Sequence, residues 1–119
     1  MADFETIADG DALYRRLAPD HINPDGSVNS AAFKLRGKPD PSISVDLARL
    51  TSLGESIAVA SRPGFRLGLL VAALPRSIGL VVRHDPLPEN HAHSLIEGEN
   101  TKSRCRQLAE GTTLLDLDT

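Results

Sequence analysis

The chain has 119 residues, a formal net charge of −3, 40% hydrophobic residues and only 3% aromatic residues. This length fits a single domain over residues 1–119 with an aliphatic core, and the negative charge and scarcity of aromatic rings argue against binding to nucleic acids or anionic membranes. Cys105 is the single cysteine, so no disulfide can form within the chain. No apolar run is long enough to cross a bilayer, and the first residues lack the basic-then-apolar pattern of a signal peptide. We therefore expect a soluble cytoplasmic protein.

The first third of the chain, about residues 1–42, is predicted to be rich in loops. The segments HINPDGSVNS and LRGKPDPS are dense in residues that favour turns. Between residues 9 and 18, the sequence DGDALYRRLA fits two structures. It can form a short helix that is capped by Asp9 or Asp11 and ends before Pro19, or it can form a short strand.

Residues 42–60 predict a strand followed by the main helix of the core. Ile43 and Val45 alternate with serines, and Asp46 is well suited to cap a helix. Apolar residues then recur at helical spacing, namely Leu47, Leu50, Leu53, Ile57 and Ala60. Gly54 weakens this helix by about 1 kcal/mol relative to alanine unless a neighbour crowds it.

Residues 65–98 predict three strands. Residues 65–74 form an apolar run typical of a buried strand. After a turn at Pro75, residues 80–84 form a second strand that could pair with the first. Residues 91–98 form a third strand with His91, His93, Leu95 and Glu97 on one face.

The remaining residues predict a helix and a final strand. Residues 100–111 read as a helix capped by Asn100 and stopped by Gly111, with Cys105, Leu108 and Ala109 buried. Residues 112–118 read as a short edge strand. The expected fold is a small single α+β domain, with a mixed or antiparallel sheet of four to five strands and two main helices on one face.

Residues 83–98, RHDPLPENHAHSLIEG, contain most of the chemistry-bearing side chains. His91 and His93 are two apart on a predicted strand, so both rings project the same way, as two histidines must to bind one divalent metal ion. His84 could approach them across a hairpin, and Asp85 or Glu89 could add an oxygen ligand. Such a histidine pair also recurs by chance, so a loop without metal remains an alternative.

A metal-free site is a second hypothesis for the same residues. His84 or His93 would act as general acid or base, oriented by Asp85, with Asn90, Ser94, His21 and Arg83 as candidate companions. Arg15 and Arg16 could bind a phosphate or carboxylate, although tandem arginines beside acids more often form surface ion pairs. No local motif of the familiar hydrolases, NTPases or oxidoreductases is present.

The leading functional hypothesis is a small interaction or regulatory domain that binds a protein partner through residues 83–97, as a subunit or accessory protein of a larger bacterial assembly. The alternative is a small hydrolase or transferase acting on a phosphorylated or nucleotide-like substrate. It would use a cluster of His84, His91 and His93, with Arg15, Arg16, Arg83 or Asn90 binding the substrate. Pairing of an edge strand with a second copy would give a homodimer.

Overall fold

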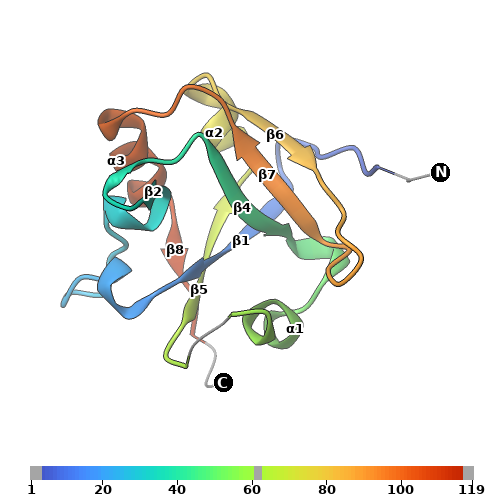
Figure 1. The fold of residues 1–119 in the computed structure, drawn as a ribbon, viewed down its shortest axis with the longest axis horizontal. Helices are drawn as coiled ribbons and strands as arrows, with labels where there is room; N and C mark the ends of the chain where they lie inside the picture. The colour runs from blue at the N-terminus through green and yellow to red at the C-terminus, as the bar shows by residue number, and fades with distance from the viewer. Residues whose placement is uncertain (1–3, 61–62, 117–119) are drawn as a thin grey trace.

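The computed structural model describes residues 4–60 and 63–116, and within them the chain forms an antiparallel sheet of six strands in the order β6-β7-β4-β1-β5-β8 (Figure 1). The strands are β1 (Ala12–Leu17), β4 (Ser42–Leu47), β5 (Arg66–Val71), β6 (Val81–His84), β7 (His93–Glu97) and β8 (Thr113–Leu114). A separate hairpin consists of β2 (Lys34–Leu35) and β3 (Lys38–Pro39). The α+β class and the antiparallel alternative are confirmed, whereas four to five strands was too few.

Helices lie on both faces of the sheet. The α-helices in the described ranges are α1 (Leu53–Ala58), α2 (Ala73–Ser77) and α3 (Lys102–Glu110), and the 3-10 helices are η1 (Pro19–His21), η2 (Ser30–Phe33) and η3 (Ala48–Leu50). α3 packs with η2 against the core face, while the Ser56 hydroxyl of α1 donates to the Asp46 carboxylate on the opposite face. The prediction of two main helices on one face was therefore wrong.

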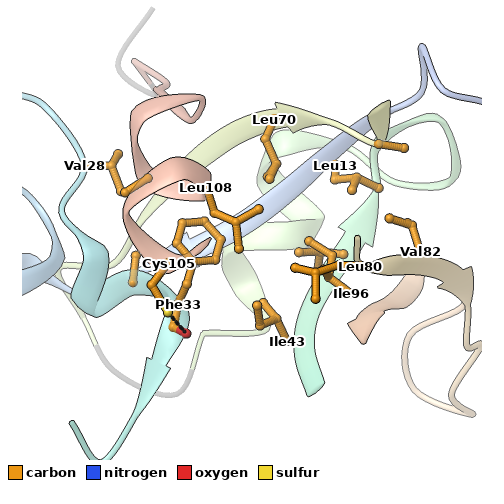
Figure 2. Close-up of a cluster of buried hydrophobic side chains, with 14 of the residues drawn as sticks. Leu13, Val28, Phe33, Ile43, Leu70, Leu80, Val82, Ile96, Cys105 and Leu108 are labelled. Carbon is orange, nitrogen blue, oxygen red and sulfur yellow. Dashed lines mark hydrogen bonds between the residues drawn. The ribbon is translucent and has the colours of Figure 1, made fainter. Parts of the chain in front are cut away.

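The hydrophobic core lies between the sheet and α3. Along β4, Ile43, Val45 and Leu47 point into the core, because neighbouring side chains of a strand project to opposite faces. Figure 2 shows sheet residues meeting residues of η2 and α3. The side chains at this junction are at most 1% exposed, and they are Leu13, Leu70, Ile96, Phe33, Cys105 and Leu108. Burial of each large aliphatic side chain contributes about 1.5–3 kcal/mol to stability.

The helix predicted to begin at Asp46 does not form. Asp46 is buried within β4, which pairs with β1 on one side and β7 on the other. The helix α1 begins at Leu53, and Ser52 caps it by accepting the Glu55 N–H at 3.1 Å. The predicted apolar row is therefore divided among β4, η3 and α1, with Ala60 beyond the end of α1, because pairing of β4 inside the sheet outweighs local helix propensity.

Several other expectations can be compared with the structure. The segment at residues 9–18 forms β1, which is the strand alternative. The strands β5 and β6 do not pair with each other, because β6 pairs with β7 and β5 with β1 and β8. Residues 72–74, expected to extend the strand, lead into α2. α3 is confirmed with its predicted buried row, although Thr101 rather than Asn100 caps it. β8 is a short edge strand within the predicted range 112–118, of which residues 117 and 118 lie outside the described residues.

Among residues 4–60 and 63–116, no helix is both long enough and apolar enough to span a lipid bilayer.

Candidate functional site

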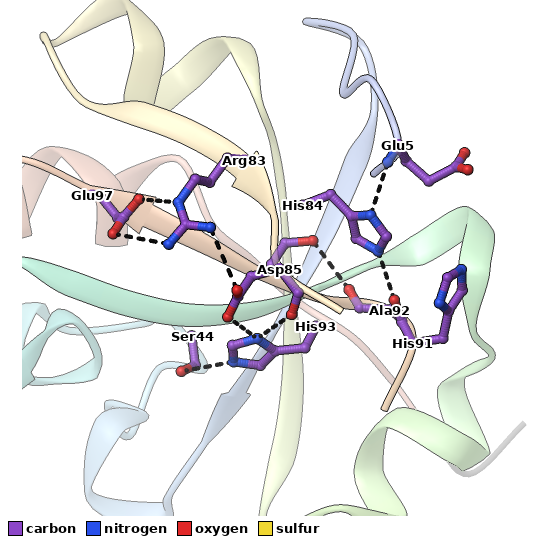
Figure 3. A network of polar contacts seen from close by, with 10 residues as sticks. Glu5, Ser44, Arg83, His84, Asp85, His91, Ala92, His93 and Glu97 are labelled. Carbon is purple, nitrogen blue, oxygen red and sulfur yellow. Dashed lines mark hydrogen bonds and ion pairs between the residues drawn. The ribbon is translucent and has the colours of Figure 1, made fainter. Parts of the chain in front are cut away.

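His93 lies at the centre of a polar chain on the face of the sheet opposite the core (Figure 3). Its Nδ1 is 2.9 Å from the main-chain oxygen of Asp85 and 3.1 Å from Asp85 Oδ2. Its Nε2 is 3.2 Å from Ser44 Oγ. Because Nδ1 faces two acceptors, the neutral ring carries its proton there, and Nε2 is left to accept the Ser44 hydroxyl proton.

Strand register brings these three residues together. Asp46 is paired with His93 and Ser44 with Leu95, so Ser44 and His93 project from neighbouring strands on the same face. Asp85 directly follows β6, and its N–H donates to the His93 oxygen at 2.9 Å. The three side chains are therefore positioned by main-chain pairing of adjacent strands rather than by a mobile loop.

Arg83 supports the same face from β6. Its Nε donates to Glu97 Oε1 at 2.5 Å, and its Nη1 lies 3.4 Å from Asp85 Oδ1. The hydrogen bond that Arg83 donates to Glu97, assisted by the charges of both carboxylates, raises the pKa of Arg83. Any anion that approaches this guanidinium must compete with two carboxylates already in place.

A second polar cluster surrounds Asp46, two residues beyond Ser44 on the same strand. The Asp46 carboxylate is fully buried and accepts hydrogen bonds from Arg16 Nη1 at 2.7 Å, Ser56 Oγ at 2.6 Å and Asn90 Nδ2 at 2.9 Å. These donors come from β1, α1 and the loop before β7. The cluster fastens three sequence-distant segments, and the charge of Arg16 is already balanced.

Arg15 and Arg16 do not act as a pair. They are neighbours on β1 and therefore point to opposite faces of the sheet. Arg15 is held on the core side, where Nε and Nη2 donate to the Ala32 oxygen and Nη1 donates to the Ser44 oxygen. Burial lowers the pKa of Arg15 to about 10, so the guanidinium remains protonated at neutral pH. Its bonds tie η2 to β4.

His84 faces the other side of the sheet from His93. The register of β6 and β7 pairs His84 with Ser94, the residue after His93. His84 Nδ1 accepts the Glu5 N–H at 2.9 Å, which leaves Nε2 as the donor to the His91 main-chain oxygen at 2.6 Å. The His91 ring packs edge-on against His84 with centroids 5.2 Å apart. His84 thus fastens the N-terminal segment to β6.

The predicted three-histidine cluster does not come together in the structure. His84 and His91 are in contact, whereas His93 lies on the opposite face with Asp85. Within the described ranges, no group of three His, Cys, Asp or Glu side chains is arranged to hold a metal ion. Binding of a divalent metal therefore stays a prediction from the sequence alone.

A groove of about 480 Å³ runs between the N-terminal segment and the free edge of β6. One wall is formed by the segment 4–7, in which Phe4 is 63% exposed. The other wall is β6 with Arg76, whose Nη2 donates to the Ile7 oxygen at 2.7 Å and the Val82 oxygen at 3.4 Å. We call this feature the edge groove, lined by Phe4, Glu5, Thr6, Ile7, Arg76, Val82, Arg83 and His84.

Sequence reasoning selected Asp85 and His93 as possible partners but missed Ser44. The alternation of Ser42, Ile43, Ser44 and Val45 already indicated that both serines lie on the face away from the core. The missing information was the pairing of β4 with β7, which no local pattern specifies. Asp46 was missed for the same reason, because a carboxylate before an apolar run resembles a helix cap.

Comparison with known proteins gives no further assignment, since no protein-family model, curated protein or solved structure shows detectable similarity to this chain.

Proposed function

We propose that this chain is a small cytoplasmic interaction domain that binds an extended, uncharged segment of a partner protein in the edge groove. The segment would add to the sheet as a further strand beside β6, as in other domains that bind peptides by strand addition. In this role the domain would serve as a subunit or accessory protein of a larger assembly.

The observation that carries this proposal is the direction of the main-chain groups of β6. The Asp85 N–H donates to the His93 oxygen, so Asp85 and every second residue before it face β7. The N–H and C=O groups of Val82 and His84 consequently point away from β7 and toward the groove. An added strand would bond to these groups, taking the place of Arg76 at the Val82 oxygen, where Nη2 now donates at 3.4 Å, and each such bond contributes about 0.5–1.5 kcal/mol.

The lining of the groove argues for an uncharged occupant. Its apolar wall includes Phe4, Ile7 and Val82. Its charged side chains are already paired, because Glu5 accepts from Arg49 at 2.7 Å, Arg76 pairs with Asp9 at 2.7 Å and Arg83 pairs with Glu97. A charged side chain entering the groove would therefore be desolvated without a free counter-charge.

Two steps test the proposal. Binding peptides are first selected from a random heptapeptide display library, and an enriched peptide is then added to isotope-labelled protein and followed by NMR. In the free protein we expect hydrogen exchange to be faster at the Val82 and His84 amides than at Arg83, whose N–H faces β7. Enriched peptides should be uncharged, and binding should slow exchange at Val82 and His84 while leaving Arg83 unchanged.

A matched pair of substitutions separates main-chain from side-chain recognition. Val82→Pro removes the N–H that faces the groove, and an edge position tolerates proline because this N–H is not part of the ladder to β7. Val82→Ala shortens the side chain and keeps the N–H. Loss of peptide binding in the proline variant alone supports strand addition. The proposal would be overturned if peptides bound both variants equally. It would also be overturned if self-association protected the Val82 and His84 amides in the absence of peptide.

A further inference from the structure

We infer that Ser44, His93 and Asp85 form a nucleophile site for acyl transfer from small, uncharged carboxylic esters. This inference is independent of the edge groove, because Ser44 and His93 lie on the opposite face of the sheet from His84. Ser44 is the group that attacks the substrate, His93 is the base, and Asp85 is a positioning residue for His93. The relative placement of these three groups can be followed in Figure 3.

The hydrogen bonds assign each residue its role. The Asp85 main-chain oxygen and Oδ2 both lie within 3.1 Å of His93 Nδ1, so that nitrogen carries the proton of the neutral ring. His93 Nε2 therefore has its lone pair directed at Ser44 Oγ, 3.2 Å away. A nucleophile, a base within hydrogen-bond distance and a third group that orients the base are the arrangement that activates a serine.

The surroundings hold this arrangement in place while leaving Ser44 accessible. The Ser44 main-chain oxygen accepts from the half-buried Arg15 at 2.8 Å, which fixes the strand beneath the hydroxyl. The His93 side chain is 11% exposed and that of Asp85 is 30% exposed, so the base is shielded from bulk water more than its carboxylate partner. Ser44 itself is half-buried, on the face of the sheet where α1 and Asn90 contact Asp46, two residues further along β4.

The class of substrate follows from the neighbours of Ser44. Leu95 stands directly across from Ser44 in the β4–β7 pairing and offers an apolar contact for an acyl group. The charges on this face are already paired, because Arg83 contacts Glu97 at 2.5 Å and Asp85 at 3.4 Å, and Asp46 contacts Arg16 at 2.7 Å. Neither a strongly anionic nor a cationic acyl group finds an unpaired counter-charge among these side chains, which favours a short uncharged acyl chain.

The reaction balances without any additional reagent except water. The Ser44 Oγ–H bond breaks, its proton moves to His93 Nε2, and Oγ forms a bond to the ester carbonyl carbon while the carbonyl electron pair moves to oxygen. Collapse of this tetrahedral species breaks the bond to the alkoxy group, which leaves with the proton from His93. Water then attacks the acyl group by the same route and restores the Ser44 hydroxyl. Asp85 stabilises the imidazolium formed in each half.

Labelling with a fluorophosphonate tests the nucleophile directly. This probe forms a stable bond between serine Oγ and phosphorus with loss of fluoride, and the modified residue is identified by peptide mass spectrometry. We expect one label per chain, located on Ser44, and slow release of p-nitrophenol from p-nitrophenyl acetate by the same protein. Absence of label at Ser44 would overturn the inference.

Matched variants distinguish an activated serine from an accessible one. Ser42→Ala changes an exposed serine two residues away on the same strand and should leave labelling of Ser44 unchanged. His93→Gln preserves an amide that can bond both Asp85 and Ser44 but cannot accept the proton, and it should lower the labelling rate at least about 100-fold. Equal labelling in wild type and His93→Gln, with both folded by circular dichroism, would contradict the proposed base.

The positioning role of Asp85 has its own readout. In wild type the labelling rate should rise with pH, because only the neutral imidazole can accept the proton. Asp85→Asn should lower the rate and alter this pH profile while leaving the midpoint of urea unfolding nearly unchanged. A pH profile that is the same in wild type and Asp85→Asn would show that Asp85 does not act through His93.

Discussion

Arg16 and Asp46 form an ion pair in which Arg16 Nη1 lies 2.7 Å from Asp46 Oδ2, and the Asp46 side chain is fully excluded from solvent. Arg76 and Asp9 form a second pair with the same separation of 2.7 Å, yet the Asp9 side chain is 77% exposed. The two pairs share their residue types and distance and differ in burial, so they allow the effect of burial to be measured within one protein.

We expect Asp46→Asn to lower the free energy of unfolding by about 3–5 kcal/mol, because it leaves the largely buried Arg16 without its counter-charge. Asp9→Asn should cost about 0–1 kcal/mol, because water solvates both members of an exposed pair. Urea denaturation of the two variants and wild type provides the comparison. Similar costs for both substitutions would mean that the Asp46 cluster contributes no more than a surface pair.

The stability of the protein should decrease as the pH falls below about 6.5, the ordinary value for histidine. Burial lowers the pKa of His21, whose Nδ1 accepts the Ala18 N–H at 3.0 Å and must be unprotonated to do so. The unfolded chain therefore binds this proton more readily, and His21 favours folding fully above its unfolded pKa and progressively less as pH falls toward its folded pKa. His21→Asn, which keeps an acceptor but does not titrate, should flatten the dependence of unfolding free energy on pH between 7 and 5. An unchanged slope would contradict this assignment.

Two glycine substitutions should change stability in opposite directions. At Gly68 in β5, an added Cβ would lie 2.5 Å from Thr112 Cγ2, and Thr112 is held in place by its hydrogen bond to the Leu108 oxygen. Gly68→Ala should therefore cost about 1–3 kcal/mol. At Gly54 in α1, nothing lies within 4 Å of the added atom. Gly54→Ala should stabilise by about 1 kcal/mol, as alanine favours helices. Thermal denaturation of both variants checks the opposite signs.

Cys105 should be unreactive in the folded protein. Its thiol is on the buried side of α3 and donates to the Phe33 oxygen at 3.3 Å, and burial raises its pKa. We expect modification by Ellman's reagent at pH 8 to be at least about 100-fold slower in the native protein than in guanidinium chloride, because thiolate formation requires opening of the core. Fast modification without denaturant would place Cys105 at the surface.

The fold was predictable from sequence where a single local pattern decided it. The spacing of Cys105, Leu108 and Ala109 identified α3, and the apolar run at residues 65–74 identified β5, although the strand ends at Val71. The prediction that a helix begins at Asp46 was wrong. The apolar spacing after Asp46 suits a helix, but Asp46 and Leu47 belong to β4, which pairs with the two neighbouring strands β1 and β7. Helical periodicity cannot report such long-range pairing.

The candidate site was predictable only in part for a related reason. Asp85 and His93 were selected because they are close in sequence, and the structure places them within hydrogen-bond distance. The predicted cluster of His93 with His84 does not form, because the β6–β7 register pairs His84 with Ser94 rather than with His93. Neighbouring residues of a strand point to opposite faces, so the two rings lie on opposite sides of the sheet. Ser44 joins His93 through a strand pairing 49 positions apart in sequence, which lies beyond any motif.

The position of β1 has a consequence for how the chain folds during synthesis. This strand lies inside the sheet and pairs along its whole length with β5, from Ala12 opposite Val71 to Leu17 opposite Arg66. At translation rates of about 5–20 residues per second, β1 waits on the order of several seconds before β5 leaves the ribosome. During that time the apolar side chains of Leu13 and Leu17 remain unpaired with their partner strand. Sheets with such distant pairings fold in milliseconds to seconds rather than microseconds, so nascent chains of this protein should depend on chaperones that shield β1.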